Sequence, residues 1–193
     1  MNFDALIERV RSCRLCEAHL PLGPKPILQA SPKARILLVG QAPGRRAHIS
    51  GQPFDDASGD RLRDWLGVTR EQFYNPELFA ILPMGFCYPG RGKSGDLPPR
   101  PECEPAWRAE LMAHLSSIEL TLALGQFAQR YCFGADGLTL SQRVSDWRTH
   151  WPQRLALPHP SPRNNVWLAR NSWFETELLP VLRSRIQQLV NQP

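Results

Sequence analysis

Two short polar segments each follow an apolar run that is long enough to form a buried strand. Gly40-Gln41-Ala42-Pro43-Gly44, here named motif 1, follows residues 36–39. His159-Pro160-Ser161-Pro162-Arg163-Asn164, here named motif 2, follows residues 154–157. Open α/β sheets bind their ligands beside turns of this kind, at the carboxyl ends of parallel strands. We therefore expect both motifs to line one cleft.

The five cysteines indicate a second kind of chemistry, metal binding. Cys13 and Cys16 form a C-x2-C pair, and Cys87 and Cys103 bracket a loop rich in Pro and Gly. Two neighbouring thiolates with two distant ones are a common tetrahedral set for zinc or an iron–sulfur cluster. The alternative is two unrelated pairs of buried thiols that pack as small hydrophobes. Cys132 follows a predicted helix, matches no ligand position and is expected in the core.

Alternating strands and helices are predicted to position these residues. Short apolar runs typical of parallel strands covered on both faces occupy residues 36–39, 78–82, 120–124 and 154–157. Helical patterns occupy residues 3–11, 60–66, 104–116, 126–131, 140–150 and 172–188. Residues 87–103 hold too much Pro and Gly for a regular helix or a central strand. The pattern predicts a three-layer α/β/α fold.

Length and charge narrow the class of protein. With 193 residues, the chain is expected to be one domain covering residues 1–193. It has no signal-peptide pattern and no apolar stretch of about 20 residues, so we expect a soluble, cytoplasmic protein without a membrane partner. The net charge of +5 fits a polyanion partner. The basic residues expected in or beside the cleft are Arg45, Arg46, Arg91, Lys93, Arg100, Arg163 and Arg170.

Motif 1, the GQPF segment at residues 51–54 and motif 2 together resemble the uracil-DNA glycosylase superfamily. The first two are closest to its iron–sulfur branch, called family 4. HPSPRN is similar to motif 2 of the single-strand-selective monofunctional uracil glycosylases. The resemblance covers residues 13–170. It implies a four-stranded, mainly parallel central sheet and a monomeric, nucleoid-associated DNA glycosylase of base excision repair that removes uracil or a related damaged base.

The resemblance also assigns roles to single residues. His159 matches the histidine that hydrogen-bonds the base carbonyl, and Phe54 matches the aromatic ring that stacks on the flipped base. Backbone N–H groups of residues 41–44 can face a pyrimidine carbonyl. Arg163, with Pro162 and Asn164, is expected to enter the duplex or grip the strand. The implied catalytic residues are His159 and Gln41, and the implied substrate contacts are Ala42, Pro43, Gly44, Phe54, Ser161 and Arg163.

The chain departs from the family at its water-positioning groups. Family 4 has acids where this chain has Gln41 and Ala47, and other branches have Asn or Asp where it has Ala42. Residues 81–86 also lack the amide that reads the uracil edge. The candidates to replace the acids are His48, Asp55 and Asp56, although the aspartates could instead cap the following helix. These departures leave an alternative function, a catalytically impaired module that binds damaged or single-stranded DNA.

The resemblance gives the cysteines a specific cofactor. It implies that Cys13, Cys16, Cys87 and Cys103 hold a structural [4Fe–4S] cluster, with zinc as the alternative. Such a site would attach the first helix and the Pro-rich loop to the edge of the sheet. Neither motif contains a lysine that could form a Schiff base, so lyase chemistry is not expected.

Overall fold

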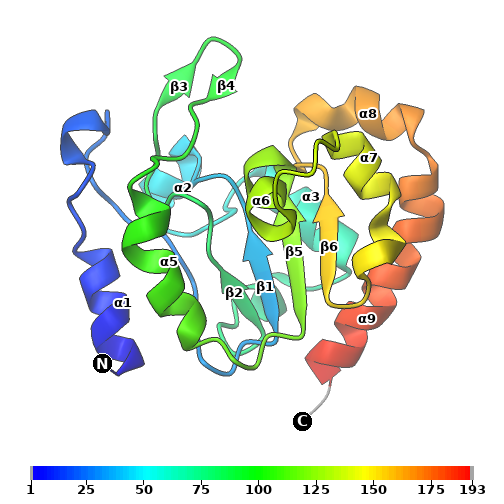
Figure 1. The fold of residues 1–193 in the computed structure, drawn as a ribbon, viewed down its shortest axis with the longest axis horizontal. Helices are drawn as coiled ribbons and strands as arrows, with labels where there is room; N and C mark the ends of the chain where they lie inside the picture. The colour runs from blue at the N-terminus through cyan, green and yellow to red at the C-terminus, as the bar shows by residue number, and fades with distance from the viewer. Residues whose placement is uncertain (1, 192–193) are drawn as a thin grey trace.

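In the computed structural model, which describes residues 2–191, four parallel strands form a central sheet between two layers of helices (Figure 1). The strand order is β2-β1-β5-β6. The strands are β1 (Ile36–Val39), β2 (Phe79–Ile81), β5 (Leu120–Leu124) and β6 (Arg154–Leu157). The predicted fold class and all four predicted strands are confirmed, and only β2 is shorter than expected.

Both faces of the sheet are buried, and in β1, β2 and β5 neighbouring side chains enter different cores. In β1, Ile36 and Leu38 enter one core, whereas Leu37 and Val39 enter the other. Leu38 pairs with Ile81 of β2 on one side and with Leu122 of β5 on the other. Side chains alternate across a strand, so continuous apolar sequence is what a sheet covered on both faces requires.

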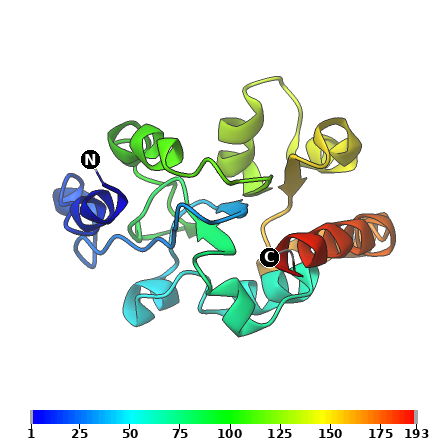
Figure 2. The same cartoon turned by 90° about the horizontal axis from the view of Figure 1, so that it is seen from below.

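One layer of helices consists of α1 (Phe3–Arg11), α5 (Cys103–Ala113) and α6 (Gly125–Phe133). The Asn2 side chain caps α1 by accepting a hydrogen bond from the Ala5 N–H at 2.8 Å. Leu6 and Val10 of α1 are fully buried on the stripe that the sequence predicts. This layer lies on the opposite face of the sheet from the C-terminal helix (Figure 2).

The second layer is built from α3 (Ala57–Leu66) and α9 (Leu179–Asn191). Helix α7 (Leu140–Ser145) and the 3-10 turn η2 (Trp147–His150) pack against the same core. Trp65 of α3 packs edge-on against Phe174, with ring centroids 4.9 Å apart. The helix predicted at 172–188 begins instead with a π-helical turn, η4 (Phe174–Leu178), and the one predicted at 140–150 divides at Asp146.

Several short elements were not predicted from the sequence. The helices are α2 (Arg45–Ser50), α4 (Arg70–Phe73) and α8 (Asn165–Arg170), and the 3-10 turns are η1 (Glu17–His19) and η3 (Pro162–Asn164). The predicted irregular segment 87–103 contains a small hairpin, β3 (Arg91–Gly92) with β4 (Gly95–Asp96). Figure 1 shows this hairpin standing at the end of the molecule toward which the strands point. Within residues 2–191, no helix is long and apolar enough to cross a bilayer.

Candidate active-site cleft

A cavity of about 630 Å³ opens at the carboxyl ends of the parallel strands. Motif 1 leaves β1 and motif 2 leaves β6, and both line this cavity. From β1 the chain moves outward to β2 at one edge of the sheet, and from β5 it moves outward to β6 at the other edge. The cavity therefore lies where the strand order reverses, the usual ligand site of an open α/β sheet. The prediction of one cleft built from both motifs agrees with this geometry.

The motif 1 turn is fixed by the segment that follows β2. The Gly40 carbonyl accepts a hydrogen bond from the Met84 N–H at 2.8 Å, and the Gln41 carbonyl accepts one from the Gly85 N–H at 3.0 Å. Gly44 then serves as the N-cap residue of α2. These contacts hold Ala42, Pro43 and Gly44 in the cavity wall in one conformation.

Phe54 forms another wall of the cavity, in a strained backbone conformation. Its φ of +54° is the one positive value at a non-glycine residue among residues 2–191. The ring packs edge-on against Phe73, with ring centroids 6.2 Å apart. Its Cζ atom lies 3.4 Å from the position that a Cβ atom on residue 40 would occupy. A Cβ on Gly59 would meet the Phe54 carbonyl oxygen at 1.7 Å. Strain of this kind persists where the surrounding packing over-determines it, often at functional sites.

His159 lies across the cavity with a defined tautomer. Its Nδ1 accepts a hydrogen bond from the Ser161 N–H at 3.2 Å, so the ring proton of the neutral form is on Nε2. Burial lowers the pKa of His159, and nearby Asp56 opposes this shift. The Asn164 amide donates to the His159 carbonyl at 2.6 Å, which fixes the turn. His159 is thus a neutral imidazole with one N–H available for a ligand.

Hairpin β3–β4 is attached to both motifs. The Gln41 side-chain amide donates to the Leu97 carbonyl at 2.8 Å. From motif 2, the Arg163 guanidinium donates to the Ser94 carbonyl. This contact requires glycine at position 95, because a Cβ atom there would clash with the Arg163 guanidinium at 2.2 Å. The structure therefore places two predicted site residues, Gln41 and Arg163, in contact with the Pro-rich loop, from which the sequence predicted basic residues at the cleft.

The hairpin brings one residue to the cavity that was not predicted, Asp96. Asp96 and Asp56 both line the cavity beside Gly44. Their Oδ2 atoms lie 3.6 Å (Asp96) and 3.7 Å (Asp56) from the position that a Cβ atom on residue 44 would occupy. Burial raises the pKa of Asp96, with Arg163 and Arg91 opposing the shift and Asp56 adding to it. No motif in the sequence marks Asp96, because its approach depends on contacts with residues more than fifty positions away.

The three residues proposed from the sequence as replacement acids or bases have different outcomes. Asp56 lines the cavity, and its Oδ1 also accepts the Gly59 N–H at 2.9 Å as the N-cap of α3. Asp55 pairs with Arg70 at 2.7 Å and, among the described residues, is not part of the cavity wall, so Asp56 is the better placed of the two aspartates. The Arg70 hydrogen bond lowers the pKa of Asp55.

His48 is also excluded from the cleft. Helix α2 turns its side chain into the interior beside Tyr88, where the residue is 9% exposed. Within residues 2–191, its Nδ1 has no hydrogen-bond partner. Burial lowers the pKa of His48, and Lys25 adds to the shift. His48 therefore cannot position water in the cavity in this conformation.

The basic residues expected at the cleft are also distributed differently. Of the seven predicted, Arg163 alone lines the cavity. Arg45 and Arg46 are exposed at the start of α2, and Arg91 and Lys93 are exposed on the hairpin. Arg170 is exposed at the end of α8. Arg100 lies elsewhere, in an ion pair with Glu102 beside the cysteines, so its placement at the cleft was wrong.

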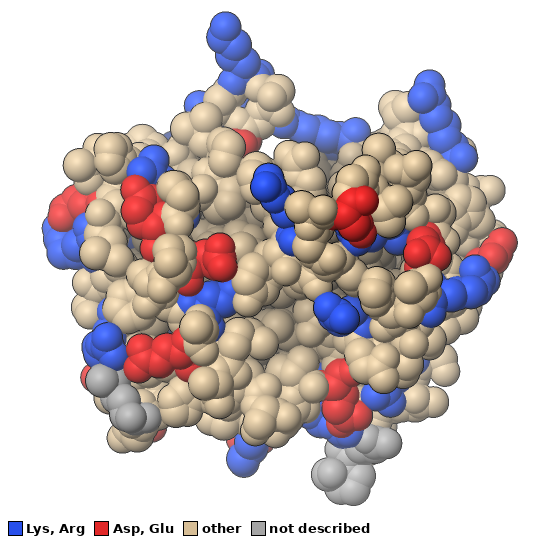
Figure 3. Space-filling model, viewed as in Figure 1, with Lys and Arg blue, Asp and Glu red and all other residues tan. Residues whose placement is uncertain are grey.

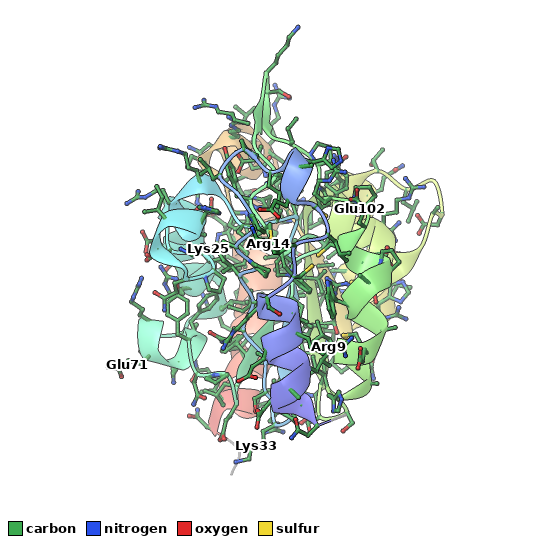
Figure 4. The ribbon with its side chains drawn as sticks, turned by 90° about the vertical axis from the view of Figure 1, so that its left-hand side faces the viewer. Arg9, Arg14, Lys25, Lys33, Glu71 and Glu102 are labelled. Carbon is green, nitrogen blue, oxygen red and sulfur yellow. The ribbon has the colours of Figure 1, made fainter. Side chains whose placement is uncertain are left out.

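Cys13, Cys16, Cys87 and Cys103 line a second, small cavity with the apolar residues Leu20, Phe86 and Trp107. The Trp107 indole N–H donates to Cys13 Sγ at 3.3 Å, and the Phe86 N–H donates to Cys103 Sγ at 3.3 Å. Burial raises the pKa of Cys87 to about 11 and that of Cys103 to about 12. Figure 4 looks onto this side of the molecule, with Arg14 and Glu102 near the segment after α1.

These thiols are not gathered around a single point. Among residues 2–191, no three His, Cys, Asp or Glu side chains are close enough together to hold a metal ion. In chemical terms the donors suit a soft metal or an iron–sulfur cluster, because the wall of this cavity, as far as the described residues form it, holds four thiols and no carboxylate or imidazole. The nearby Glu102 carboxylate accepts a hydrogen bond from Cys16 Sγ at 3.7 Å. Cys132 packs against the core on the α5 side, as predicted, and burial raises its pKa to about 11.

Comparison with known proteins agrees with the motifs. Residues 28–183 match the family model described as "Uracil DNA glycosylase superfamily". The chain is 28% identical to the "Type-4 uracil-DNA glycosylase" of Archaeoglobus fulgidus over 137 residues, 68% of this chain and 64% of that protein. It is also 28% identical to the protein of that name from Thermotoga maritima over 141 residues, 72% of this chain and 68% of the relative. The match thus spans less than two thirds of the Archaeoglobus protein's length.

Proposed function

The chain belongs to the uracil-DNA glycosylase superfamily, and from that membership we propose that it is a monofunctional DNA glycosylase. Its substrate would be uracil or a related damaged base in DNA, and its reaction would be hydrolysis of the N-glycosidic bond. The observation that carries this proposal is that one cavity joins the motif 1 turn, the ring of Phe54 and the N–H of His159. An aromatic floor and fixed hydrogen-bond donors are what a flipped base requires.

The proposed mechanism begins with capture of the base. An extrahelical base would lie on the ring of Phe54, which is held in place by Phe73 and by the close approach of Gly59. Backbone N–H groups at the start of the motif 1 turn, those of Gln41 and Ala42, would face a carbonyl of that base. Because packing fixes these groups before the substrate arrives, little reorganisation is needed when the bond breaks.

His159 would stabilise the departing base. As the glycosidic bond breaks, its electron pair moves onto the base and negative charge grows on the carbonyl oxygen. The Nε2–H of a neutral imidazole can donate to that oxygen, because Nδ1 is already occupied by Ser161. A donor aimed at charge that develops only in the transition state lowers the barrier more than it strengthens substrate binding.

The cavity also supports a reaction without a Schiff-base intermediate. Within the described residues, no lysine lines it, so no amine is placed to form a Schiff base with the sugar. In the hydrolysis proposed here, water is the nucleophile. This is the basis for proposing a monofunctional enzyme.

We further propose that Cys13, Cys16, Cys87 and Cys103 hold an iron–sulfur cluster with a structural role. All four thiols line one small cavity, and four thiolates are a donor set that both zinc and an iron–sulfur cluster take. Each relative described above carries the name "Type-4 uracil-DNA glycosylase", and the resemblance of this chain to that branch supports the choice of the cluster.

Exposed basic residues support DNA as the partner. Figure 3 shows Lys and Arg side chains standing along the edge of the molecule that carries the hairpin. Arg45 and Arg46 follow motif 1 directly, and Arg91 and Lys93 lie on the hairpin. Positive groups on two sides of one cavity suit a phosphate backbone that passes across it.

A second candidate function is a DNA-binding module without catalytic activity. It is favoured by one observation: the family's acid positions are occupied by Gln41, Ala42 and Ala47, and the Gln41 amide is engaged by the hairpin. Such a module would still capture a flipped base on Phe54.

One experiment separates the two functions. The purified protein is incubated in excess with oligonucleotides that contain uracil, hypoxanthine, xanthine or 5-hydroxymethyluracil, single-stranded and paired, and base release is measured. Release of at least one base supports the glycosylase. If none is released although the same DNA is bound tightly, the enzyme proposal is wrong and the binding module is supported.

A further inference from the structure

Asp96 enters the cavity on a hairpin that both motifs hold in place. The Gln41 amide donates to the Leu97 carbonyl at 2.8 Å, and Arg163 donates to the Ser94 carbonyl. The hairpin is therefore held from both motifs, one residue after Asp96 and two residues before it. Each contact spans more than fifty residues of sequence, so the position of Asp96 is a product of the fold and not of a local turn.

The Asp96 carboxylate is free to act on a ligand. Within residues 2–191, no hydrogen bond to either of its oxygens is present, and its Oδ2 lies 3.6 Å from where a Gly44 side chain would begin. Asp56 approaches the same point, but one of its oxygens is engaged by the Gly59 N–H at the start of α3. Asp96 is thus the less constrained of the two carboxylates in the cavity.

The negative charge of the Asp96 carboxylate determines which part of the substrate it can stabilise. A carboxylate beside the departing base would oppose the negative charge that grows there, whereas one beside the sugar would stabilise its developing positive charge. Asp96 lies next to Gly44, from which α2 begins with the exposed Arg45 and Arg46. Those cations suit phosphates, so this side of the cavity fits the sugar and phosphate of the flipped nucleotide.

We propose that Asp96 is the catalytic carboxylate of this site, which orients the attacking water and takes its proton, and that Gln41 is a positioning residue that acts through the hairpin. In the step envisaged, the bond between the base nitrogen and sugar C1′ breaks, and its electron pair leaves with the base. The water oxygen bonds to C1′, its proton passes to the Asp96 carboxylate and then to solvent, and the base anion takes a proton from solvent. The inference rests on the proposed glycosylase function.

The test compares variants in single-turnover base release, with enzyme in excess over a cleavable oligonucleotide. Asp96→Asn and Asp96→Ala should each lower the rate by about 10²-fold or more, the usual loss when a general base is removed. The dissociation constant for the uncleaved DNA should change little. The matched control is Asp64→Asn, since Asp64 is a 78% exposed aspartate of α3 outside the cavity wall.

Two further measurements separate catalysis from a structural role. Added formate, a small carboxylate, should partly restore the rate of Asp96→Ala and should not affect Asp96→Asn, where the space is filled. Gln41→Ala should lower the rate in the wild-type background but have little further effect in the Asp96→Ala background. Contacts that act as one unit give such non-additive changes.

Three results would overturn the inference, and they are distinguishable. If the wild type releases a base and Asp96→Asn releases it within threefold of the wild-type rate, Asp96 is not the catalytic carboxylate. If Asp96→Asn changes which base is released without slowing the best one, Asp96 reads the base instead. If the wild type releases none of the bases, the proposed function itself fails, and this assignment fails with it.

Discussion

Replacement of His159 by Ala tests the central contact of the proposed mechanism. The structure gives His159 one free donor, Nε2–H, because Nδ1 accepts from the Ser161 N–H. Loss of one donor to a developing oxyanion costs about 10²–10³-fold in rate, or about 2.7–4 kcal/mol of transition-state stabilisation. The motif 1 amides remain in His159→Ala, so we expect a residual rate and not complete inactivity.

The protonation state sets the pH dependence of this effect. Burial lowers the pKa of His159 below its usual value of about 6.5, so the neutral form is the one present at neutral pH. Lowering the pH through the folded-state pKa would protonate Nδ1 and break its contact with the Ser161 N–H. The His159-dependent part of the rate should therefore be flat above about pH 6.5 and fall at lower pH.

The assay is single-turnover base release by His159→Ala and by the wild type between pH 5 and pH 8. The control is His19→Ala, a histidine that is exposed on η1, outside the cavity wall. Affinity for abasic DNA should be unchanged, because the contact strengthens only as charge develops. A rate for His159→Ala within threefold of the wild type would refute the reasoning. A wild-type rate that rises as the pH falls through about 6.5 would refute the neutral tautomer.

Three other experiments test the remaining parts of the site. Phe54→Ala should weaken capture of the flipped base by about 1–3 kcal/mol, the usual stacking contribution, while affinity for abasic DNA stays constant in a fluorescence titration. Gly59→Ala should lower the free energy of unfolding by about 1–3 kcal/mol in a urea titration, because the new methyl group would lie 1.7 Å from the Phe54 carbonyl oxygen. Anaerobically purified protein should contain iron, and Cys87→Ser should lose it while Cys132→Ser keeps it; stoichiometric zinc without iron would contradict the cluster.

The sequence predicted the sheet well because its strands are buried on both faces. Continuous apolar runs such as residues 36–39 and 78–82 admit few other structures when turn residues bound them. The cleft followed from the same logic, since both motifs leave the carboxyl ends of strands in one parallel sheet. Both predictions depend only on the local sequence, namely on short apolar runs and the turn residues that bound them.

The failures arise where a side chain's direction depends on an unpredicted element. His48 lies four residues after Gly44 and looked close enough to the cleft, but α2 turns it toward Tyr88. Asp55 is next to Asp56 in the chain, yet Arg70 binds the first while the second caps α3. Neither direction can be predicted without knowing that α2 and α4 form, and both helices are short with weak apolar patterns.

Asp96 could not be predicted, because the loop that carries it is shaped by contacts from both ends of the chain. The same segment supplies Cys87 and Cys103 at its ends and Asp96 near its middle. A metal site at the cysteines would fix where the segment begins and ends, while Gln41 and Arg163 fix its centre over the cavity. If both anchors are needed to hold the carboxylate beside Gly44, loss of the metal should slow base release even though the cysteines lie in a separate cavity. The cysteine site and the cleft would then be coupled through one loop, which gives a structural cofactor a measurable effect on the rate.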